Sequence, residues 1–245
     1  MGELIAVLSG KGGTGKTSLC AGIATALAAE GEKVLCIDCD IGLRNLDISL
    51  AMADSGALSF VDICRGDYGL EYAATNRDFP TLAFLTAPLG CSADDIDTQA
   101  FAEMLRKARK MYNYVFLDAP AGLDAGFRLC AAYADRIILV TNPEPSAIRD
   151  AASTGHRLEL MGKTQIRIVV NRVKKKLLEV TKRTVDDVMD DAGLPLLGVV
   201  PEDENVTLAA TFEKPLLRYT RKGAAAACRR IAKRIRGLSE PVSIR

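Results

Sequence analysis

Residues 4–17 read LIAVLSGKGGTGKT, and this stretch decides the fold of the 245-residue chain. Its first part, residues 4–8, is entirely apolar, as in a strand that is buried on both faces of a sheet. Residues 10–17 fit the pattern G-x-x-x-x-G-K-[ST], and apolar residues at helical spacing follow. A strand, a glycine-rich loop and a helix in this order predict a phosphate-binding loop, or P-loop.

The residues of this loop have separate predicted tasks. The Lys16 ammonium would reach the β- and γ-phosphates of ATP, and the Thr17 hydroxyl would ligate Mg²⁺. Backbone N–H groups and the positive end of the following helix would surround the phosphates. The predicted nucleotide-binding residues are Gly10, Lys11, Gly12, Gly13, Thr14, Gly15, Lys16, Thr17 and Ser18. The alternative is a glycine turn before an ordinary helix, but this interpretation does not explain why Lys16 and Thr17 follow the last glycine.

Two further apolar runs end in carboxylates. Residues 34–37 precede Asp38 and Asp40, and residues 114–117 precede Asp118. Ligands of open α/β sheets bind at the carboxyl ends of the strands, so these three side chains should lie beside the P-loop. Asp118 fits a Walker B carboxylate that holds Mg²⁺, usually through water. A carboxylate after residue 37 can hold a Mg²⁺-bound water, orient an attacking water, or cap the next element.

Several segments together resemble the ParA/MinD superfamily of deviant Walker A ATPases. The loop K-G-G-T-G-K-T carries a second lysine, Lys11, as in that superfamily. Residues 37–47, IDCDIGLRNLD, resemble the switch I region of the MinD family of division-site selection ATPases, and residues 118–122, DAPAG, resemble its switch II. The T-N-P-E and I-R-D elements of residues 141–150 also resemble it. The resemblance extends from residue 4 to about residue 238.

The resemblance implies roles that the residue pattern alone leaves open. Lys11 would reach across a homodimer to the nucleotide of the partner, and Asp40 would position the hydrolytic water, so that Lys11, Lys16 and Asp40 form the catalytic set. The expected Mg²⁺ site comprises Thr17, Asp38 and Asp118. The remaining residues expected at the nucleotide are Gly122, at the γ-phosphate, and Asn171, Pro201 and Glu202, around adenine. From residue type alone, Asn171 is equally a turn former.

The order of the elements predicts one α/β domain over residues 1–245. Apolar runs alternate with helical patterns, and there is no internal repeat or linker. We expect a P-loop NTPase fold with a mostly parallel twisted sheet of about seven or eight strands and helices on both faces. The predicted strands are residues 4–8, 34–37, 82–85, 114–118, 136–140, 166–170 and 196–200. The predicted helices include residues 58–65, 98–112 and 223–238, and residues 86–97 form a polar loop.

The net charge favours no particular class of binding partner, whereas the cysteine content indicates the cellular compartment. The formal net charge is +1, although residues 214–236 contain only basic charges. The seven cysteines include a C-x-x-C at Cys36 and Cys39, which lies within a predicted strand and is interpreted as two buried small residues. An odd number of cysteines in a P-loop protein predicts reduced thiols and a cytoplasmic protein, or one peripheral to the inner face of the cell membrane.

The expected function is an ATP-dependent dimerisation switch that hydrolyses ATP slowly and positions proteins of the division-site system. The alternative is a ParA-like DNA-partition or flagellar-placement ATPase, which would bind DNA non-specifically through the basic C-terminal region. A division-site switch is not expected to bind nucleic acid. An iron–sulfur ATPase would need cysteines at a dimer axis, and Cys91 and Cys130 are the only loosely suitable pair. A metabolic ligase would need a substrate pocket that the sequence does not display.

The C-terminal region bears on membrane binding. Proteins of the MinD family usually continue into an amphipathic tail with bulky apolar residues, whereas residues 239–245 here read SEPVSIR. We therefore expect weak or no binding to membranes. The apolar residues Ile231, Ile235 and Leu238 are expected to dock on the sheet of their own domain.

Overall fold

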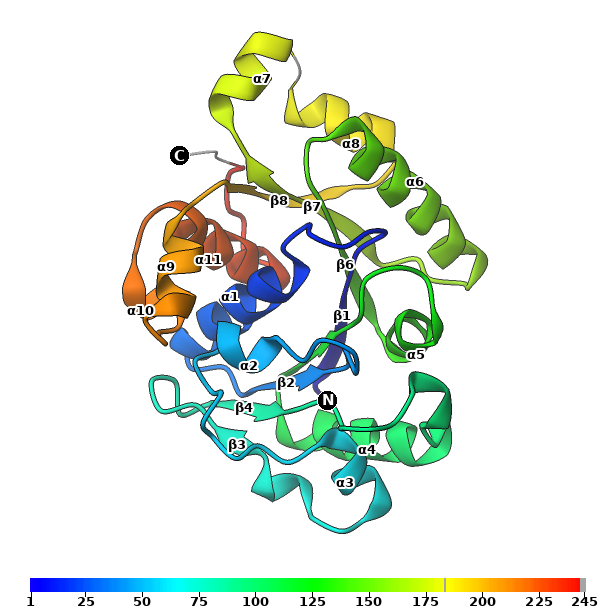
Figure 1. Cartoon of the computed structure of the whole chain (residues 1–245). Coiled ribbons are helices and arrows are strands. Elements are labelled where there is room, and N and C mark those ends of the chain that lie inside the picture. Colours follow the sequence, from blue (N-terminus) through cyan, green and yellow to red (C-terminus); the bar gives the residue numbers. More distant parts are fainter. Residues whose placement is uncertain (183, 243–245) are drawn as a thin grey trace.

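The computed structural model describes residues 1–182 and 184–242 and has an eight-stranded sheet at its centre (Figure 1). The strand order is β3-β4-β2-β5-β1-β6-β7-β8, and every neighbouring pair is parallel except β3 with β4. The strands are β1 Glu3–Leu8, β2 Val34–Asp38, β3 Ala74–Thr75, β4 Leu82–Leu85, β5 Tyr114–Asp118, β6 Arg136–Thr141, β7 Ile166–Val173 and β8 Leu196–Pro201. The seven predicted strands and the predicted fold class are confirmed. The sequence analysis missed β3, since two residues cannot show a period.

Helices cover both faces of this sheet, which is the layered arrangement expected of a parallel sheet. One face packs against α1 Lys16–Ala29, α2 Leu46–Ser49, α9 Asn205–Thr211, α10 Leu216–Tyr219 and α11 Gly223–Ile235. The other face packs against α3 Phe60–Arg65, α4 Thr98–Met111, α5 Ala125–Tyr133, α6 Pro145–Leu160 and α8 Val185–Ala192. The remaining short elements are α7 Lys175–Thr181, η1 Leu70–Tyr72 and η2 Ala93–Asp95. In Figure 1, α7 stands away from the layers above the ends of β7 and β8.

The helices that follow the sequence pattern begin and end for identifiable reasons. At the start of α3 the Ser59 hydroxyl accepts the Val61 N–H, and the helix stops at Gly66, which has a φ of 80°. In α4, the predicted apolar stripe is buried against the sheet. The predicted loop of residues 86–97 contains the 3₁₀ turn η2, which begins with the capping residue Ser92.

The C-terminal helix confirms one expectation and corrects another. Ile231 and Ile235 are buried in the core between α11, α1 and the sheet, as predicted. Leu238 is 49% exposed, because α11 ends at Ile235 and Gly237 turns the chain with a φ of 79°. The helical seam therefore stops one turn earlier than the residue pattern indicated. No helix among the described residues is long and apolar enough to span a bilayer.

The C-x-x-C cysteines lie on opposite faces of the sheet. Cys36 belongs to the core under α1 and α11, and Cys39 to the core on the other face. Both thiols are buried, which confirms the interpretation as two small core residues rather than a shared metal site.

Candidate functional site

The P-loop connects β1 to α1 at the carboxyl edge of the sheet and needs its glycines for conformation and for space. Gly13 and Gly15 have φ values of 80° and 83°, in the left-handed region that favours glycine. A Cβ atom on Gly15 would lie 2.4 Å from Nδ2 of Asn171, and one on Gly10 would lie 2.6 Å from Oγ1 of Thr154 in α6. The loop is thus wedged between β7 and α6, and side chains at these positions would push it out of place.

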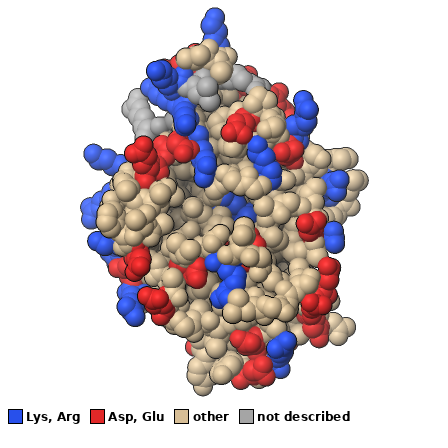
Figure 2. All heavy atoms as spheres, viewed as in Figure 1, with Lys and Arg blue, Asp and Glu red and all other residues tan. Residues whose placement is uncertain are grey.

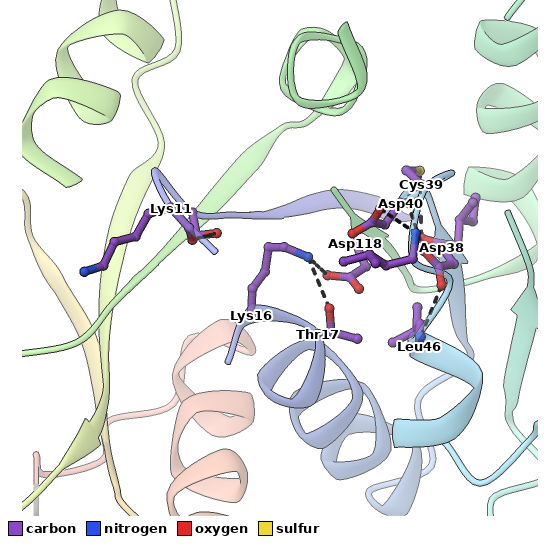
Figure 3. Close-up of polar contacts among 11 residues, drawn as sticks. Lys11, Lys16, Thr17, Asp38, Cys39, Asp40, Leu46 and Asp118 are labelled. Atoms are coloured by element: carbon purple, nitrogen blue, oxygen red, sulfur yellow. Dashed lines mark hydrogen bonds and ion pairs between the residues drawn. The ribbon is translucent and has the colours of Figure 1, made fainter. Parts of the chain in front are cut away.

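A buried ion pair joins the P-loop to the end of β5 (Figure 3). Nζ of Lys16 lies 2.6 Å from Oδ1 of Asp118 and 3.2 Å from Oγ1 of Thr17. Lys16 and Asp118 are almost fully buried, with 6% and 1% of their side chains exposed. Burial disfavours the charged ammonium, but the Asp118 carboxylate outweighs this effect and raises the pKa of Lys16. Lys16 is therefore held as a cation where its predicted phosphate partner would lie.

The second oxygen of Asp118 is suited to a divalent cation. Oδ2 of Asp118 is buried and has no hydrogen-bond partner among the described residues. The Thr17 hydroxyl lies nearby, within reach of the same Lys16 ammonium. Hard oxygen donors of this kind fit Mg²⁺, which is usually held by one or two protein oxygens together with waters and substrate phosphates. Within the described residues no cluster of three or more His, Cys, Asp or Glu side chains could form an all-protein metal cage.

Asp38 lies beside Asp118 but is directed at its own loop. The two residues are register partners in β2 and β5. Oδ1 of Asp38 accepts the Asp40 N–H at 2.9 Å, and Oδ2 accepts the Leu46 N–H at 3.1 Å, at the first residue of α2. Burial, followed by the Asp118 charge, raises the pKa of Asp38 to about 7. This geometry is that of an acidic residue that caps the next element, so a direct role of Asp38 in holding Mg²⁺ stays a prediction.

Asp40 begins the loop that Asp38 holds. Its Oδ1 atom accepts the Leu43 N–H at 3.2 Å, and its carbonyl oxygen accepts the Arg44 N–H at 3.1 Å. The Asp40 charge lies near enough to Lys16 to favour the charged form of the lysine. In Figure 3, Asp38, Asp40 and Asp118 gather on the side of the P-loop to which Lys16 points. The structure therefore brings together the carboxylates that the sequence predicted to meet.

The second lysine of the loop lies apart from this cluster. Lys11 extends away from Lys16 in Figure 3. Its Nζ atom lies 3.1 Å from Oε2 of Glu144 and 3.1 Å from Oγ of Ser146, at the start of α6. The Lys11 and Glu144 side chains are 30% and 62% exposed, so the pair lies at the surface. An exposed ion pair of this kind contributes about 0–1 kcal/mol and is readily exchanged for another partner.

A pocket beside the P-loop contains the three residues predicted to surround adenine. It is lined by Gly15, Ser18, Asn171, Arg172, Pro201 and Glu202, among others. Nδ2 of Asn171 donates to the Thr14 carbonyl oxygen at 2.8 Å, which ties β7 to the loop. Asn171 lies within β7, so the alternative that it is a turn former is wrong. A register shift between Val170 and Val173 places Asn171 at this pocket.

The sequence analysis missed two residues of this region. Arg172 has a φ of 55°, and its Nε atom would lie 3.6 Å from a Cβ on Gly15, over the P-loop. Asp203 accepts the Ala224 N–H at 2.9 Å and so fixes the start of α11 at the pocket. Asp203 could have been predicted, because it directly follows Pro201 and Glu202 at the end of a predicted strand. The positive φ of Arg172 could not, because it arises from the bulge in β7, which no sequence pattern indicates.

Switch II also lies against the loop. A Cβ atom on Gly12 would lie 3.9 Å from Cβ of Ala121, which places residues 118–122 beside the P-loop. Gly122 has a φ of 92° and open space around its Cα. The backbone at Gly122 is therefore free of side-chain crowding at the position expected for a phosphate contact.

Comparison with known families gives a consistent match. The profile of the CobQ/CobB/MinD/ParA nucleotide binding domain matches residues 5–216. The septum site-determining protein MinD of Synechocystis is 33% identical over 244 residues, which cover 98% of this chain and 92% of the relative. MinD of Bacillus subtilis is 34% identical over 249 residues, covering 100% of this chain and 92% of the relative.

Solved structures agree with these relatives. The MinC:MinD cell division protein complex of Aquifex aeolicus contains a chain that is 33% identical, with a TM-score of 0.91 and 98% of each chain covered. MinD of Pyrococcus horikoshii, complexed with Mg-ADP, is 28% identical, with a TM-score of 0.83 and 96% of each chain covered. From the P-loop geometry, the matched profile and these near full-length likenesses, the chain belongs to the CobQ/CobB/MinD/ParA nucleotide-binding family and, within it, to the septum site-determining MinD proteins.

Proposed function

We propose that this protein is a MinD-like ATPase that acts as an ATP-dependent dimerisation switch in division-site placement and hydrolyses ATP slowly to ADP and phosphate. One observation carries the proposal. The buried Lys16–Asp118 pair, with the unpartnered Oδ2 of Asp118, lies beside Asp40 and the P-loop, while Lys11 of the same loop points outward. This arrangement supports phosphoryl transfer at Lys16, with a second lysine, Lys11, placed at the surface where it could meet another protomer.

On nucleotide binding, Lys16 would exchange its carboxylate partner, Asp118, for the phosphates of the nucleotide. The polyphosphate would draw Lys16 from Asp118 toward the β- and γ-phosphates, and the backbone N–H groups of residues 10–18 would surround the phosphate oxygens. The adenine would lie in the pocket of Asn171, Pro201 and Glu202. The Lys16 charge is satisfied in both states, so the ammonium need never lie buried without an anion.

The residues that Lys16 leaves behind fit Mg²⁺. Oδ2 of Asp118, either directly or through water, and the Thr17 hydroxyl would hold it, with Asp38 as a further predicted oxygen donor. Bound there, Mg²⁺ would supply neutralisation of charge on the phosphate oxygens. Departure of Lys16 would also free Oδ1 of Asp118, so that the whole carboxylate could take part in holding the cation.

Hydrolysis would rest on positioning and charge. Asp40 would orient the attacking water, because it lies at the same edge of the sheet as Lys16 and its loop is held by both oxygens of Asp38. Lys16 in one protomer and the partner's Lys11 would stabilise the charge that develops on the phosphate. For this, each Lys11 must leave Glu144 and Ser146, which are weak surface partners.

The switch would read the γ-phosphate through Gly122. Its backbone N–H lies in a loop that passes beside the P-loop at Ala121, so a contact with the γ-phosphate would order switch II in ATP and release it in ADP. Two protomers would associate with ATP and separate with ADP.

The partners would be proteins of the division-site system, because a structurally similar relative is part of a MinC:MinD complex. The most direct test is capture of partners with Asp40→Ala loaded with ATP, compared with wild type loaded with ADP. Division proteins recovered with the ATP form alone support the proposal. Recovery of DNA-partition or flagellar proteins instead would refute the division role while leaving the ATPase role intact.

The other candidate functions receive no support from the described residues. Lys, Arg, Asp and Glu side chains are mixed over the face shown in Figure 2, so that face has no single-sign surface for nucleic acid. Cys130 lies on the buried side of α5 with no exposed surface, so the iron–sulfur alternative lacks a surface-accessible Cys91–Cys130 pair.

A further inference from the structure

A second charged pocket lies at the amino ends of β6 and β7, at the opposite end of the strands from the P-loop. It encloses about 180 Å³ and is lined by Ile5, Arg136, Ile137, Ile138, Gln165, Arg167, Leu197, Arg234, Ile235 and Gly237. Three of these side chains are guanidinium groups, and no described lining residue is acidic. We call it the three-arginine pocket.

The sheet register explains why the arginines meet. Arg136 pairs with Ile5 of β1, and Arg167 pairs with Ile138 of β6. Residues two apart on a strand face the same side, so Arg136 lies on the side of Ile138, and Arg167 lies there as its cross-strand neighbour. Ile138 packs in the core beneath α11, and Arg234 comes to the same place from the last turn of that helix.

The three guanidinium groups are only partly satisfied by the chain. Arg136 pairs with Glu3, with Nε and Oε1 2.6 Å apart, and donates from Nη1 to the Ile235 carbonyl oxygen. Arg234 donates from Nη1 to the Leu197 carbonyl oxygen at 2.7 Å and from Nε to the Glu240 carbonyl oxygen at 2.9 Å. The pocket therefore holds guanidinium groups whose hydrogen bonds go mainly to neutral carbonyl oxygens.

Two donors remain for a ligand. Nη2 of Arg234 is buried and has no partner among the described residues, and Arg167, an exposed residue of β7, lines the same pocket. A buried N–H without an acceptor costs about 1–3 kcal/mol, more when it is charged. Burial, and then the nearby charge of Arg230, lowers the pKa of Arg234, and the Glu240 charge opposes this shift only in part.

We propose that the three-arginine pocket binds a compact oxyanion, a phosphate or carboxylate group, that accepts hydrogen bonds from Arg234 and Arg167. The planar fork of arginine matches the two oxygens of such a group. Ile5, Ile138 and Leu197, all buried, form an apolar floor beneath the guanidinium groups. Because the ligand would join α11 to β6 and β7, it would stabilise the folded protein through binding.

The probes are inorganic phosphate and acetate, each titrated at constant ionic strength against a chloride reference. The wild-type protein is first saturated with ADP and Mg²⁺, so that the P-loop is occupied. Arg167→Gln removes an exposed arginine from the pocket, and Arg234→Lys retains the charge but loses the fork. Arg157→Gln, at an exposed arginine of α6, is the matched control. The readouts are calorimetric affinity and melting temperature.

We expect saturable binding of phosphate, acetate or both to the wild type and to Arg157→Gln, and at least tenfold weaker binding to Arg167→Gln and Arg234→Lys. Saturation by phosphate alone assigns a phosphoryl ligand, and saturation by acetate alone assigns a carboxylate. If neither anion binds beyond the chloride reference, the pocket holds only water and the proposal is wrong. Unchanged affinity in Arg167→Gln would also overturn it, since the anion then lies elsewhere.

Discussion

Nζ of Lys16 lies 2.6 Å from Oδ1 of Asp118, a buried ion pair between residues 102 positions apart in the chain. The parallel register of β1 and β5 aligns Val7 with Asp118, so the P-loop begins beside the last residue of β5, which is Asp118. In this state each of the two groups satisfies the charge of the other. In the proposed function, a phosphate that draws Lys16 away from Asp118 would therefore have to replace an existing partner of the lysine.

Replacing Lys16 with alanine should abolish tight binding of both ATP and ADP, because it removes the charge that faces the β- and γ-phosphates. It should also lower the free energy of unfolding of the nucleotide-free protein by about 3–5 kcal/mol, since Asp118 is left buried without its counter-ion. Nucleotide titration and urea unfolding measure the two effects. Lys107→Ala, at an exposed lysine of α4, is the control. Unchanged affinity for both nucleotides would mean that the loop is misinterpreted.

Stability of the nucleotide-free protein should fall as pH rises through the range in which Asp38 ionises. The pKa of Asp38 is raised from 3.8 to about 7, so between these values the folded state binds a proton that the unfolded state has released. The free energy of unfolding therefore decreases from about pH 4 to pH 7, by up to about 4 kcal/mol from this group.

Asp38→Asn removes the ionisable group, at the cost of one of the two backbone hydrogen bonds, because an amide nitrogen cannot accept an N–H. The stability of the wild type relative to Asp38→Asn should therefore be greatest near pH 4 and should decline between pH 4 and pH 8, because only the wild type loses a proton over this range. Urea unfolding across this range makes the comparison. Parallel pH profiles for the two proteins would show that Asp38 does not titrate in the folded state.

Replacing Lys11 with alanine should spare ADP binding and remove ATP-driven dimerisation and hydrolysis. The reason is geometric: Lys11 points away from the cluster of Lys16 and Asp118, and its ammonium bonds Glu144 and Ser146 at the surface. Light scattering after size-exclusion chromatography, with ATP and with ADP, gives the oligomeric state. An ATP dimer as stable as that of the wild type would reject a role for Lys11 across the interface.

Replacing Asp40 with alanine should slow hydrolysis by about ten- to a thousandfold, or about 1.4–4 kcal/mol in activation free energy, which is typical for a positioning group. ATP affinity should stay close to that of the wild type, so the variant should accumulate as an ATP dimer. Single-turnover hydrolysis and nucleotide titration separate the two quantities. Asp54→Ala, at an exposed carboxylate after α2, is the control. Normal turnover in Asp40→Ala would place the water elsewhere.

Some of the site could be predicted because its signals are local. The strand, glycine loop and helix around residues 4–17 are contiguous, so their chemistry is visible in one stretch of sequence. Asp118 could be predicted as well, because an apolar run that ends in a carboxylate has one location in a parallel sheet, the carboxyl edge. The sequence by itself therefore determined the fold class and the meeting of the P-loop with Asp38, Asp40 and Asp118.

Only the tertiary structure decided what these groups do to one another in the absence of nucleotide. The Lys16–Asp118 pair and the hydrogen bond from Asn171 to the Thr14 carbonyl oxygen each join segments far apart in the chain. Such contacts depend on strand register, on a bulge in β7 and on the space that glycines leave open. Hydrophobic periodicity records which face of an element is buried, but it carries no information about which polar atoms meet across that face, and packing alone settles that.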